Sequence, residues 1–327
     1  MNFLILSAGR RTKLVEYFTK EFKGTGLVIA TDCDKLAPAL YKADKGYIVP
    51  RIDDPNYINV IKDICIKENV KGLISLIDPE LSLISKNEEL FEEIGVKCFL
   101  SPYSVTEICF DKYKMFEFLR DNSFKTAKSF MNFDDFKKSY DNGEVELPVF
   151  VKPACGSASI NINKVNTLEE VKFLMDKYEG LMIQEFLDGQ ELGVDVYTDL
   201  ISGEVVSIFA KEKIRMRSGE TDKSKSIKCD KLFGIIKDFV TKLGTKGPID
   251  VDVFRVGDEY YISEVNPRFG GGHPHAYECG ENFMQFIKNN LNNVPNDCNI
   301  GNYEDNVYVI KHDTLTVLRE NNMIVNL

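Results

Sequence analysis

Long apolar runs are absent from this sequence of 327 residues. Its longest apolar stretches, such as 3–6 and 72–77, span only a few residues, whereas a membrane-spanning helix needs about 20. The first residues, MNFLILSAGRR, also lack the basic segment and the apolar core of a secretory signal. We therefore expect no membrane partner and a cytoplasmic location.

Closely spaced cysteines and histidines are also absent. The eight cysteines are scattered without a Cys-x-x-Cys pair, and two of the three histidines lie in one short string, His273-Pro274-His275. Zinc sites need ligands at close, regular spacing, so neither a zinc site nor a histidine cluster is expected. The cysteines are typical of reduced thiols in a cytosolic protein.

An excess of positive charge is lacking as well. Asp and Glu number 51 against 41 Lys and Arg, which gives a net charge of −10. A broad surface for nucleic acid requires clustered cations, so we expect no nucleic-acid partner. A local basic pocket for a nucleotide remains compatible with this balance.

The first strand, turn and helix are short of glycine. The turn Ser7-Ala8-Gly9-Arg10-Arg11 has a single glycine, whereas the dinucleotide fingerprint uses three for the turn, the pyrophosphate and helix packing. Although Asp32 follows the second strand, the missing glycines argue against a nicotinamide oxidoreductase. Arg10 and Arg11 could bind an anion at the helix N-terminus, or they could simply be solvated.

Residues 1–108 alternate between segments that predict strands and segments that predict helices. Apolar strands are expected at 3–7, 27–31, 72–77 and 97–100, and helices at 13–22, 57–68 and 80–94. Apolar strands between helices are typical of a parallel, doubly wound sheet with both faces covered. We therefore predict an α/β domain here.

The rest of the chain predicts a mixed α+β arrangement. Helices are expected at 107–122, 168–178 and 231–242, and strands near 129 and at 149–152, 181–185, 191–215 (two strands around Ser202-Gly203), 249–255 and 260–265. Residues 217–228 are polar and cationic, which predicts a mobile loop. Short strands are expected from about residue 303.

The most informative stretch is an acidic hairpin that turns at Gly257-Asp258. Asp252 and Glu264 lie on its two strands at comparable distances from the turn. Alternation places Glu264, Asn266 and Arg268 on one face. Mg²⁺ prefers oxygen ligands and is usually held by one or two carboxylates plus phosphates, and it would relieve the repulsion between two carboxylates. We therefore predict a metal site, although a solvent-facing polar strand is the simpler alternative.

A second signal is a lysine at the end of an apolar strand. The strand Val149–Lys152 runs into the small-residue segment Cys155-Gly156-Ser157-Ala158-Ser159. Small residues let backbone N–H groups approach phosphate oxygens, and a lysine adds a point charge. The pattern therefore indicates a phosphate site, although Lys-Pro at a strand end is often only a turn.

Together these motifs resemble the ATP-grasp superfamily, and most of all proteins of the carbamoyl-phosphate-synthase large-subunit-like type. The resemblance rests on the 12-residue spacing from Asp252 to Glu264, the Glu264-x-Asn266-x-Arg268 string and the glycine segment after it. It implies a pre-ATP-grasp Rossmann-like domain at 1–108, an ATP-grasp domain at 109–300 with a small nucleotide-covering subdomain at about 123–187, and a C-terminal β extension at 301–327.

The resemblance also implies ATP as cofactor, with Mg²⁺ (which Mn²⁺ could replace) held by Asp252, Glu264 and Asn266. The implied nucleotide-binding residues are Lys112, Lys152, Gly156, Ser157, Ala158, Ser159, Gln184, Glu185, Phe186, Leu187, Glu191 and Lys211. The three lysines would contact phosphate and the small residues would fold over it. The four residues from Gln184 would border the adenine, and Glu191 would meet the ribose.

The implied reaction is a ligation in which a carboxylate is activated as an acyl phosphate and joined to an amine, with release of ADP and phosphate. Arg268 would neutralise charge on the transferred phosphoryl group. Arg215 begins a cationic segment that could close over the site as a lid or remain a solvated loop. No covalent nucleophile is evident in the sequence.

Several alternatives remain open at this stage. The chain has one ATP-grasp unit, so the two phosphorylations of a full carbamoyl-phosphate synthase are not expected. An ATP-binding regulatory or partner protein without turnover is the alternative, although such a protein would usually have lost one of the four hairpin residues. The sequence does not identify the carboxylate and amine substrates, and it leaves a homo-oligomer open.

Overall fold

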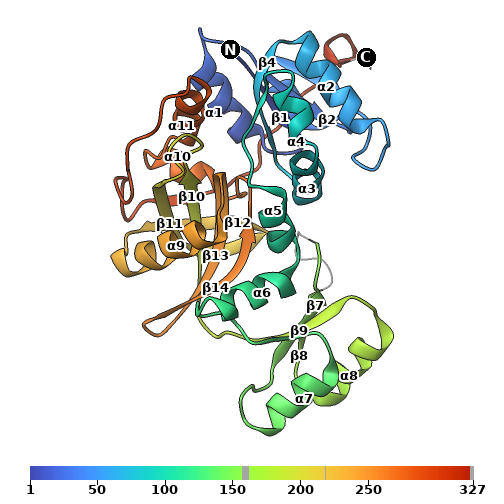
Figure 1. Ribbon diagram of the computed structural model, residues 1–327, viewed down its shortest axis with the longest axis vertical. Helices are drawn as coiled ribbons and strands as arrows, with labels where there is room; N and C mark the ends of the chain where they lie inside the picture. Colours follow the sequence, from blue (N-terminus) through green and yellow to red (C-terminus); the bar gives the residue numbers. More distant parts are fainter. Residues whose placement is uncertain (157–161, 218, 325–327) are drawn as a thin grey trace.

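The computed structural model describes residues 1–156, 162–217 and 219–324. Three β-sheets organise these residues (Figure 1), with five, four and six strands. The five-stranded sheet lies at one end of the elongated molecule and the four-stranded sheet at the other, with the six-stranded sheet between them. The predicted combination of an N-terminal parallel sheet with a second, mixed part is confirmed, while the domain boundaries remain predictions.

The N-terminal sheet is parallel, with strand order β3-β2-β1-β4-β5. Its elements are β1 (Asn2–Leu6), α1 (Thr12–Phe22), β2 (Val28–Asp32), η1 (Pro38–Tyr41), β3 (Lys45–Ile48), α2 (Tyr57–Lys67), β4 (Val70–Ser75), α3 (Asp78–Lys86), α4 (Glu88–Glu92) and β5 (Lys97–Cys98). The helix expected at 80–94 is in fact two helices, α3 and α4. Strand β3 was not expected.

Helices cover both faces of this sheet, as a doubly wound fold requires. Phe3 and Ile5 of β1 pack in one core with α1 and with α11 (Phe283–Leu291), which comes from the far end of the chain. Leu4 and Leu6 point to the opposite core, with α2, α3 and α4. The late helix α11 therefore ties the C-terminal part of the chain to the first domain.

The middle of the chain forms the predicted small α+β unit. Its elements are β6 (Ser129–Phe130), α7 (Phe133–Asp141), β7 (Val149–Pro153), β8 (Asn163–Val165), α8 (Leu168–Lys177) and β9 (Leu181–Glu185). The helices α5 (Tyr103–Phe110) and α6 (Lys112–Asp121) precede this unit. The sheet is antiparallel, with order β6-β9-β7-β8. The helix expected at 107–122 breaks at Asp111, because its side chain accepts the backbone N–H groups of Tyr113 and Lys114 and so begins a new helix.

The six-stranded sheet is antiparallel, with order β14-β13-β10-β11-β12-β15. Its strands are β10 (Gln190–Thr198), β11 (Val205–Arg217), β12 (Glu220–Ile227), β13 (Gly247–Val256), β14 (Glu259–Asn266) and β15 (Tyr308–Ile310), and the remaining elements are α9 (Asp230–Leu243), α10 (Pro274–Glu278) and η2 (Glu320–Asn322). Alternate residues such as Val194, Val251 and Val253 are fully buried and pack with α9. The opposite face is left for polar side chains.

The loop expected at 217–228 is wrong, because Glu220–Ile227 is strand β12. Its inward positions carry Thr221, Ser224 and Ser226, which are buried. Short hydroxyl side chains replace the apolar residues that normally reveal a strand, so the period-two pattern was hidden. None of the helices in the described ranges has the length and apolar character needed to cross a bilayer.

Candidate functional site

One face of the six-stranded sheet carries a concentration of charge. The strand register places Glu264, Asp252 and Gly193 in one row, and Asn266, Asp250 and Asp195 in the next. We call this surface the charged face; its polar residues are Glu191, Asp195, Lys211, Lys213, Asp250, Asp252, Glu264 and Asn266. Because strands alternate, every one of these lies on the side opposite to the valine core.

The predicted metal ligands meet on this face. Asp252 and Glu264 are direct Cα partners across β13 and β14, and Asn266 pairs with Asp250 in the next row. Burial raises the pKa of Asp252 to about 7, against the opposing effect of Lys213. No three Cys, His, Asp or Glu converge as a metal cluster within 1–156, 162–217 and 219–324. Two carboxylates and an amide oxygen in neighbouring rows are ligands of the kind that Mg²⁺ takes, together with phosphate and water.

Lys213, which the sequence analysis did not single out, lies among these ligands. Its Nζ donates to Asp252 Oδ1 at 2.5 Å and to Glu191 Oε1 at 2.8 Å, and its side chain is 6% exposed. Burial alone would lower the pKa of this ammonium, but Asp252 and Glu191 outweigh burial and raise it. Lys213 therefore links the predicted ribose residue to the predicted metal site.

The structure places Lys211 elsewhere on the charged face. Its Nζ is completely buried and donates to Asp195, which also contacts His273 Nδ1 at 3.2 Å. Burial would raise the pKa of Asp195, but Lys211 and His273 lower it. Gly193 makes room for this packing, since a Cβ there would lie 3.1 Å from Lys211 Cε and 3.2 Å from Lys213 Cε.

The four-stranded sheet supplies a buried cation. Lys152 of β7 donates from Nζ to Gln184 Oε1 of β9 at 2.7 Å, and Gln184 Nε2 donates to Ser129 Oγ at 3.0 Å. Lys152 is 8% exposed, and burial lowers its pKa to about 8. No carboxylate of the described chain forms a hydrogen bond or ion pair with it. A phosphate group bound beside Lys152 would bring a negative charge next to this buried ammonium and favour its charged form.

Lys112 joins the two sheets. It begins α6, where its backbone N–H donates to the Ala154 carbonyl at 2.8 Å. Its Nζ lies 3.6 Å from Glu264 Oε1 and donates to the Gly156 carbonyl. The predicted phosphate lysine and a predicted metal ligand are thus neighbours. Ser157, Ala158 and Ser159 lie outside the described residues.

The segment predicted to border adenine leaves β9 at the edge of the same sheet. Glu185 is held by the Lys128 backbone, with its N–H donating to Lys128 O at 2.8 Å and its Oε2 accepting from Lys128 N at 3.0 Å. Phe186 packs edge-on against Phe150, and Lys164 Nζ lies 3.6 Å from the centre of its ring. Leu187 is partly buried. The adenine role of these residues remains a prediction.

Arg268 lies beyond the metal ligands. Its Nη2 donates to Asn266 Oδ1 and to Asp78 Oδ2, both at 3.0 Å. Burial would lower the pKa of Arg268, but Asp78 and other carboxylates raise it. Arg215 is not brought into this group, because its side chain is 66% exposed and, among the described residues, its ion-pair partner is Asp222, at 4.0 Å.

The glycine segment after Arg268 is surrounded by charged side chains. A Cβ on Gly270 would collide with the Asp250 carboxylate, and a Cβ on Gly272 would lie 2.7 Å from Lys211 Cε. A Cβ on Gly271 would come within 2.9 Å of both Arg11 Nη1 and the Glu220 carboxyl carbon. Because these three glycines have no side chains, charged groups from the first turn of the chain and from the six-stranded sheet can approach their backbone closely.

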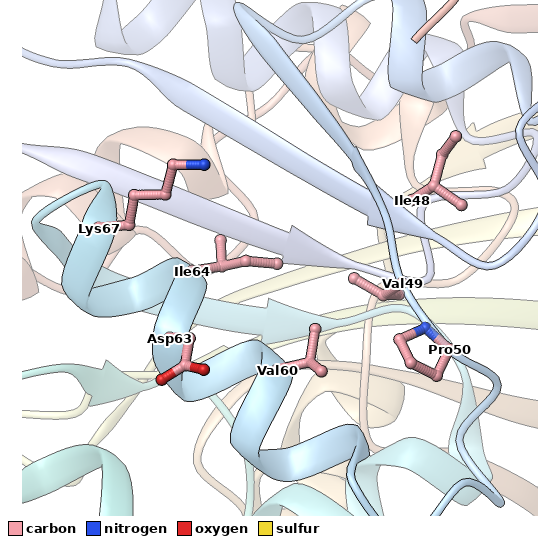
Figure 2. Close-up of a pocket in the computed structure, with 7 residues that line it drawn as sticks. All are labelled: Ile48, Val49, Pro50, Val60, Asp63, Ile64 and Lys67. Carbon is pink, nitrogen blue, oxygen red and sulfur yellow. The ribbon is translucent and has the colours of Figure 1, made fainter. Parts of the chain in front are cut away.

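Arg11 belongs to the first turn, and its Nη2 lies 3.6 Å from Glu220 Oε1. The predicted anion-binding arginine is therefore turned toward the charged face and the three glycines. A hollow in the described surface lies away from these residues, between α2 and the end of β3 (Figure 2). Figure 2 shows Val60 and Ile64 facing Val49 and Pro50 there. None of the predicted site residues lines it.

Comparison with known protein families identifies the family to which this chain belongs. Residues 3–99 match the PylC-like N-terminal domain, and residues 109–272 match the ATP-grasp domain. The chain belongs to the ATP-grasp family. The predicted metal-binding hairpin and the predicted phosphate lysines lie within the residues that match the ATP-grasp domain, and their roles remain predictions.

Individual relatives agree with this assignment. Carbamoyl-phosphate synthase of Methanobrevibacter smithii is 26% identical over 275 residues, which are 79% of this chain and 71% of that protein. The chain spans only 22% of the carbamoyl phosphate synthase large chain of Clostridium botulinum, at 25% identity over 69% of its own length.

Solved structures share the fold. N5-carboxyaminoimidazole synthetase of Staphylococcus aureus aligns with a TM-score of 0.72 at 15% identity, covering 93% of this chain and 79% of that one. The biotin carboxylase domain of 2-oxoglutarate carboxylase from Hydrogenobacter thermophilus, solved with MgADP and bicarbonate, aligns with a TM-score of 0.71 at 15% identity, covering 94% and 73%. At such identities the likeness concerns the fold.

Proposed function

We propose that this chain is an ATP-dependent ligase that phosphorylates a small-molecule carboxylate and joins it to an amine. One observation carries the proposal: the paired carboxylates of Asp252 and Glu264 lie beside Lys112, which comes from another part of the chain and whose Nζ is 3.6 Å from Glu264 Oε1. Carboxylates alone would suit a metal and lysines alone would suit an anion. Together they suit a metal-bound triphosphate.

The residues divide the work of binding between them. Lys152 and Lys112 would contact phosphate oxygens, and Asp252, Glu264 and Asn266 would hold Mg²⁺, which when bound would neutralise charge on the phosphates. Lys213 keeps Asp252 and Glu191 in place. Because Lys213 already neutralises part of Asp252, the metal shares that carboxylate with an ammonium.

The chemistry then needs mainly positioning and charge neutralisation. A substrate carboxylate oxygen attacks the γ-phosphorus, and the bond from that phosphorus to the bridging oxygen of ADP breaks. The amine attacks the acyl carbon, loses a proton, and displaces phosphate. Arg268, placed beyond the ligand pair and bonded to Asn266, stabilises the charge that develops during phosphoryl transfer.

The test is a screen for ADP and phosphate release with paired carboxylates and amines, followed by transfer of label from an oxygen-18 carboxylate to phosphate. Arg268→Ala should reduce turnover far more than ATP binding, because it acts on charge that develops in transfer. Formation of AMP, or retention of all label in the product, would contradict the acyl phosphate. Absence of ADP release with every pair would favour a binding protein without turnover.

A further inference from the structure

The position of Arg268 depends on a residue of the other domain. Among the described residues its ion-pair partner within 4 Å is Asp78, whose Oδ2 accepts from Nη2 at 3.0 Å. The two side chains are 11% and 10% exposed, so water contributes little to either. The remaining contacts of Arg268 are neutral oxygens of Asn266 and Phe269.

Asp78 is itself held firmly by the N-terminal sheet. It begins α3, immediately after strand β4. Two residues later, the buried Glu80 accepts hydrogen bonds from the hydroxyls of Ser7, Tyr57 and Ser75. This network fixes the first turn of α3 against β1, α2 and β4. Asp78 therefore presents its carboxylate from a rigid support rather than from a loop.

The pair also leaves hydrogen-bonding capacity unused. Asp78 Oδ1 and Arg268 Nε are buried and have no hydrogen-bond partner in the described chain. A buried charge with incomplete partners is costly, so a pair kept only for stability would be better satisfied. Such incomplete satisfaction is common where a side chain serves a reaction.

Building on the proposed ligase function, we infer that Asp78 is a positioning residue that holds the Arg268 guanidinium in its catalytic orientation. The N-terminal domain thereby sets the reactivity of a site whose metal and nucleotide residues all lie outside it. Arg268 would otherwise be free to rotate toward Asp250 and Glu264, which are also close enough to attract it. Asp78 prevents this by accepting a hydrogen bond from Arg268 Nη2 at 3.0 Å.

The experiment compares Asp78→Asn, Asp78→Glu and a matched control, Asp63→Asn, which makes the same change on the exposed face of α2. Asp78→Asn should lower kcat by about 10- to 100-fold, the range for misplacing a supported catalytic group, while the KM for ATP changes less than about twofold. Asp78→Glu should recover part of the loss, and Asp63→Asn should behave as wild type.

A double-mutant cycle separates positioning from a structural role. If Asp78 acts through Arg268, Asp78→Asn should add little to the loss caused by Arg268→Ala. Additive losses, or a change in the KM for ATP as large as that in kcat, would overturn the inference while leaving the ligase function intact. So would wild-type kcat in Asp78→Asn.

A binding measurement keeps the test independent of turnover. Aluminium fluoride with Mg²⁺ and ADP mimics the phosphoryl group in transfer, so its affinity should fall in Asp78→Asn and in Arg268→Ala, with ADP affinity unchanged. Equal affinity in wild type and Asp78→Asn, or no binding to the wild type, would overturn the inference. If no substrate pair releases ADP, the ligase proposal fails separately, and this measurement still decides the role of Asp78.

Discussion

The two sheets that meet at the candidate site differ in the charge they offer to a ligand, because Lys211 and Lys213 of the larger sheet are already paired with carboxylates of that sheet. The four-stranded sheet offers Lys152 from its centre, while the six-stranded sheet offers the carboxylates of Asp252 and Glu264. Lys112, between them, contacts both parts. A nucleotide with its metal has the same division of charge, with anionic phosphates and a cation. The site is thus complementary to the pair rather than to either alone.

Two buried lysines sharpen this comparison. Lys152 and Lys213 are both less than 10% exposed, yet burial lowers the pKa of Lys152 to about 8, whereas carboxylates raise that of Lys213 despite burial. Lys213 already has its counter-charges, whereas the hydrogen bond that Lys152 makes within the described residues is to the neutral Gln184. Burial therefore leaves Lys213 as a cation held by carboxylates, whereas Lys152 fits the proposed role of binding an anion.

The largest effect is expected on the carboxylate side. Glu264→Gln should lower turnover by about 10²- to 10³-fold, the scale of removing one charge-stabilising group from an active site, because the site loses a metal ligand. It should also abolish most of the gain in ATP affinity that Mg²⁺ provides, with the fold intact. Calorimetry with and without Mg²⁺ measures this gain.

Glu259→Gln is the matched control for that variant. Glu259 lies on the same strand, is 47% exposed, and pairs with Lys125 and Lys231 instead of the site. Equal ATP affinity with and without Mg²⁺ in the wild type would remove the metal assignment. A Glu259→Gln loss as large as that of Glu264→Gln would show that the strand, not the ligand, is responsible.

The cationic side should respond differently at two positions. Lys152→Met should weaken ATP binding by about 10- to 100-fold, as expected for losing a charged hydrogen bond, with little change in stability. Lys211→Met should instead destabilise the fold by about 3–5 kcal/mol, because it leaves Asp195 buried without its main counter-charge. Nucleotide titrations and denaturant unfolding of both variants measure the two effects.

The reverse order would be informative. If Lys211→Met weakened ATP binding more than Lys152→Met while leaving stability unchanged, the triphosphate would lie along β11 and not beside β7. The comparison between the two sheets would then be wrong, since both charges would come from the larger one.

How far the sequence predicts this site depends on the range of each contact. Asp252 and Glu264 were found because a hairpin brings near neighbours together, and its turn sets their register. Lys152 was found because a strand end and small residues adjoin it in sequence. Lys213 was missed because β11 is long and its register against β10 is set by tertiary packing, so the neighbouring Lys211 was chosen instead.

Asp78 lay further out of reach, because 190 residues separate it from Arg268 and nothing local marks it as more than the start of a helix. The elements of the fold likewise divide into those that a local sequence pattern reveals and those that it does not. Apolar strands of the first sheet were predicted well, since burial on both faces leaves a continuous apolar signal. Strand β12 was missed, because its inward side chains are hydroxyls that no hydrophobic period reveals.

The smallest expected effect is a protonation change at Lys152. With a pKa of about 8 in the free protein, this side chain is charged at pH 6.5 and largely neutral at pH 9. Phosphate favours the charged form and raises the pKa, so ATP binding at pH 9 should take up most of one proton. Affinity should correspondingly fall above pH 8, by at most about tenfold per pH unit. Asp252 has a pKa of about 7 and is already ionised at pH 9.

Calorimetry in two buffers with different ionisation enthalpies measures the proton uptake on ATP binding, and Lys152→Met should abolish it. Equal uptake in both proteins would mean that the buried lysine of the four-stranded sheet does not meet the phosphates.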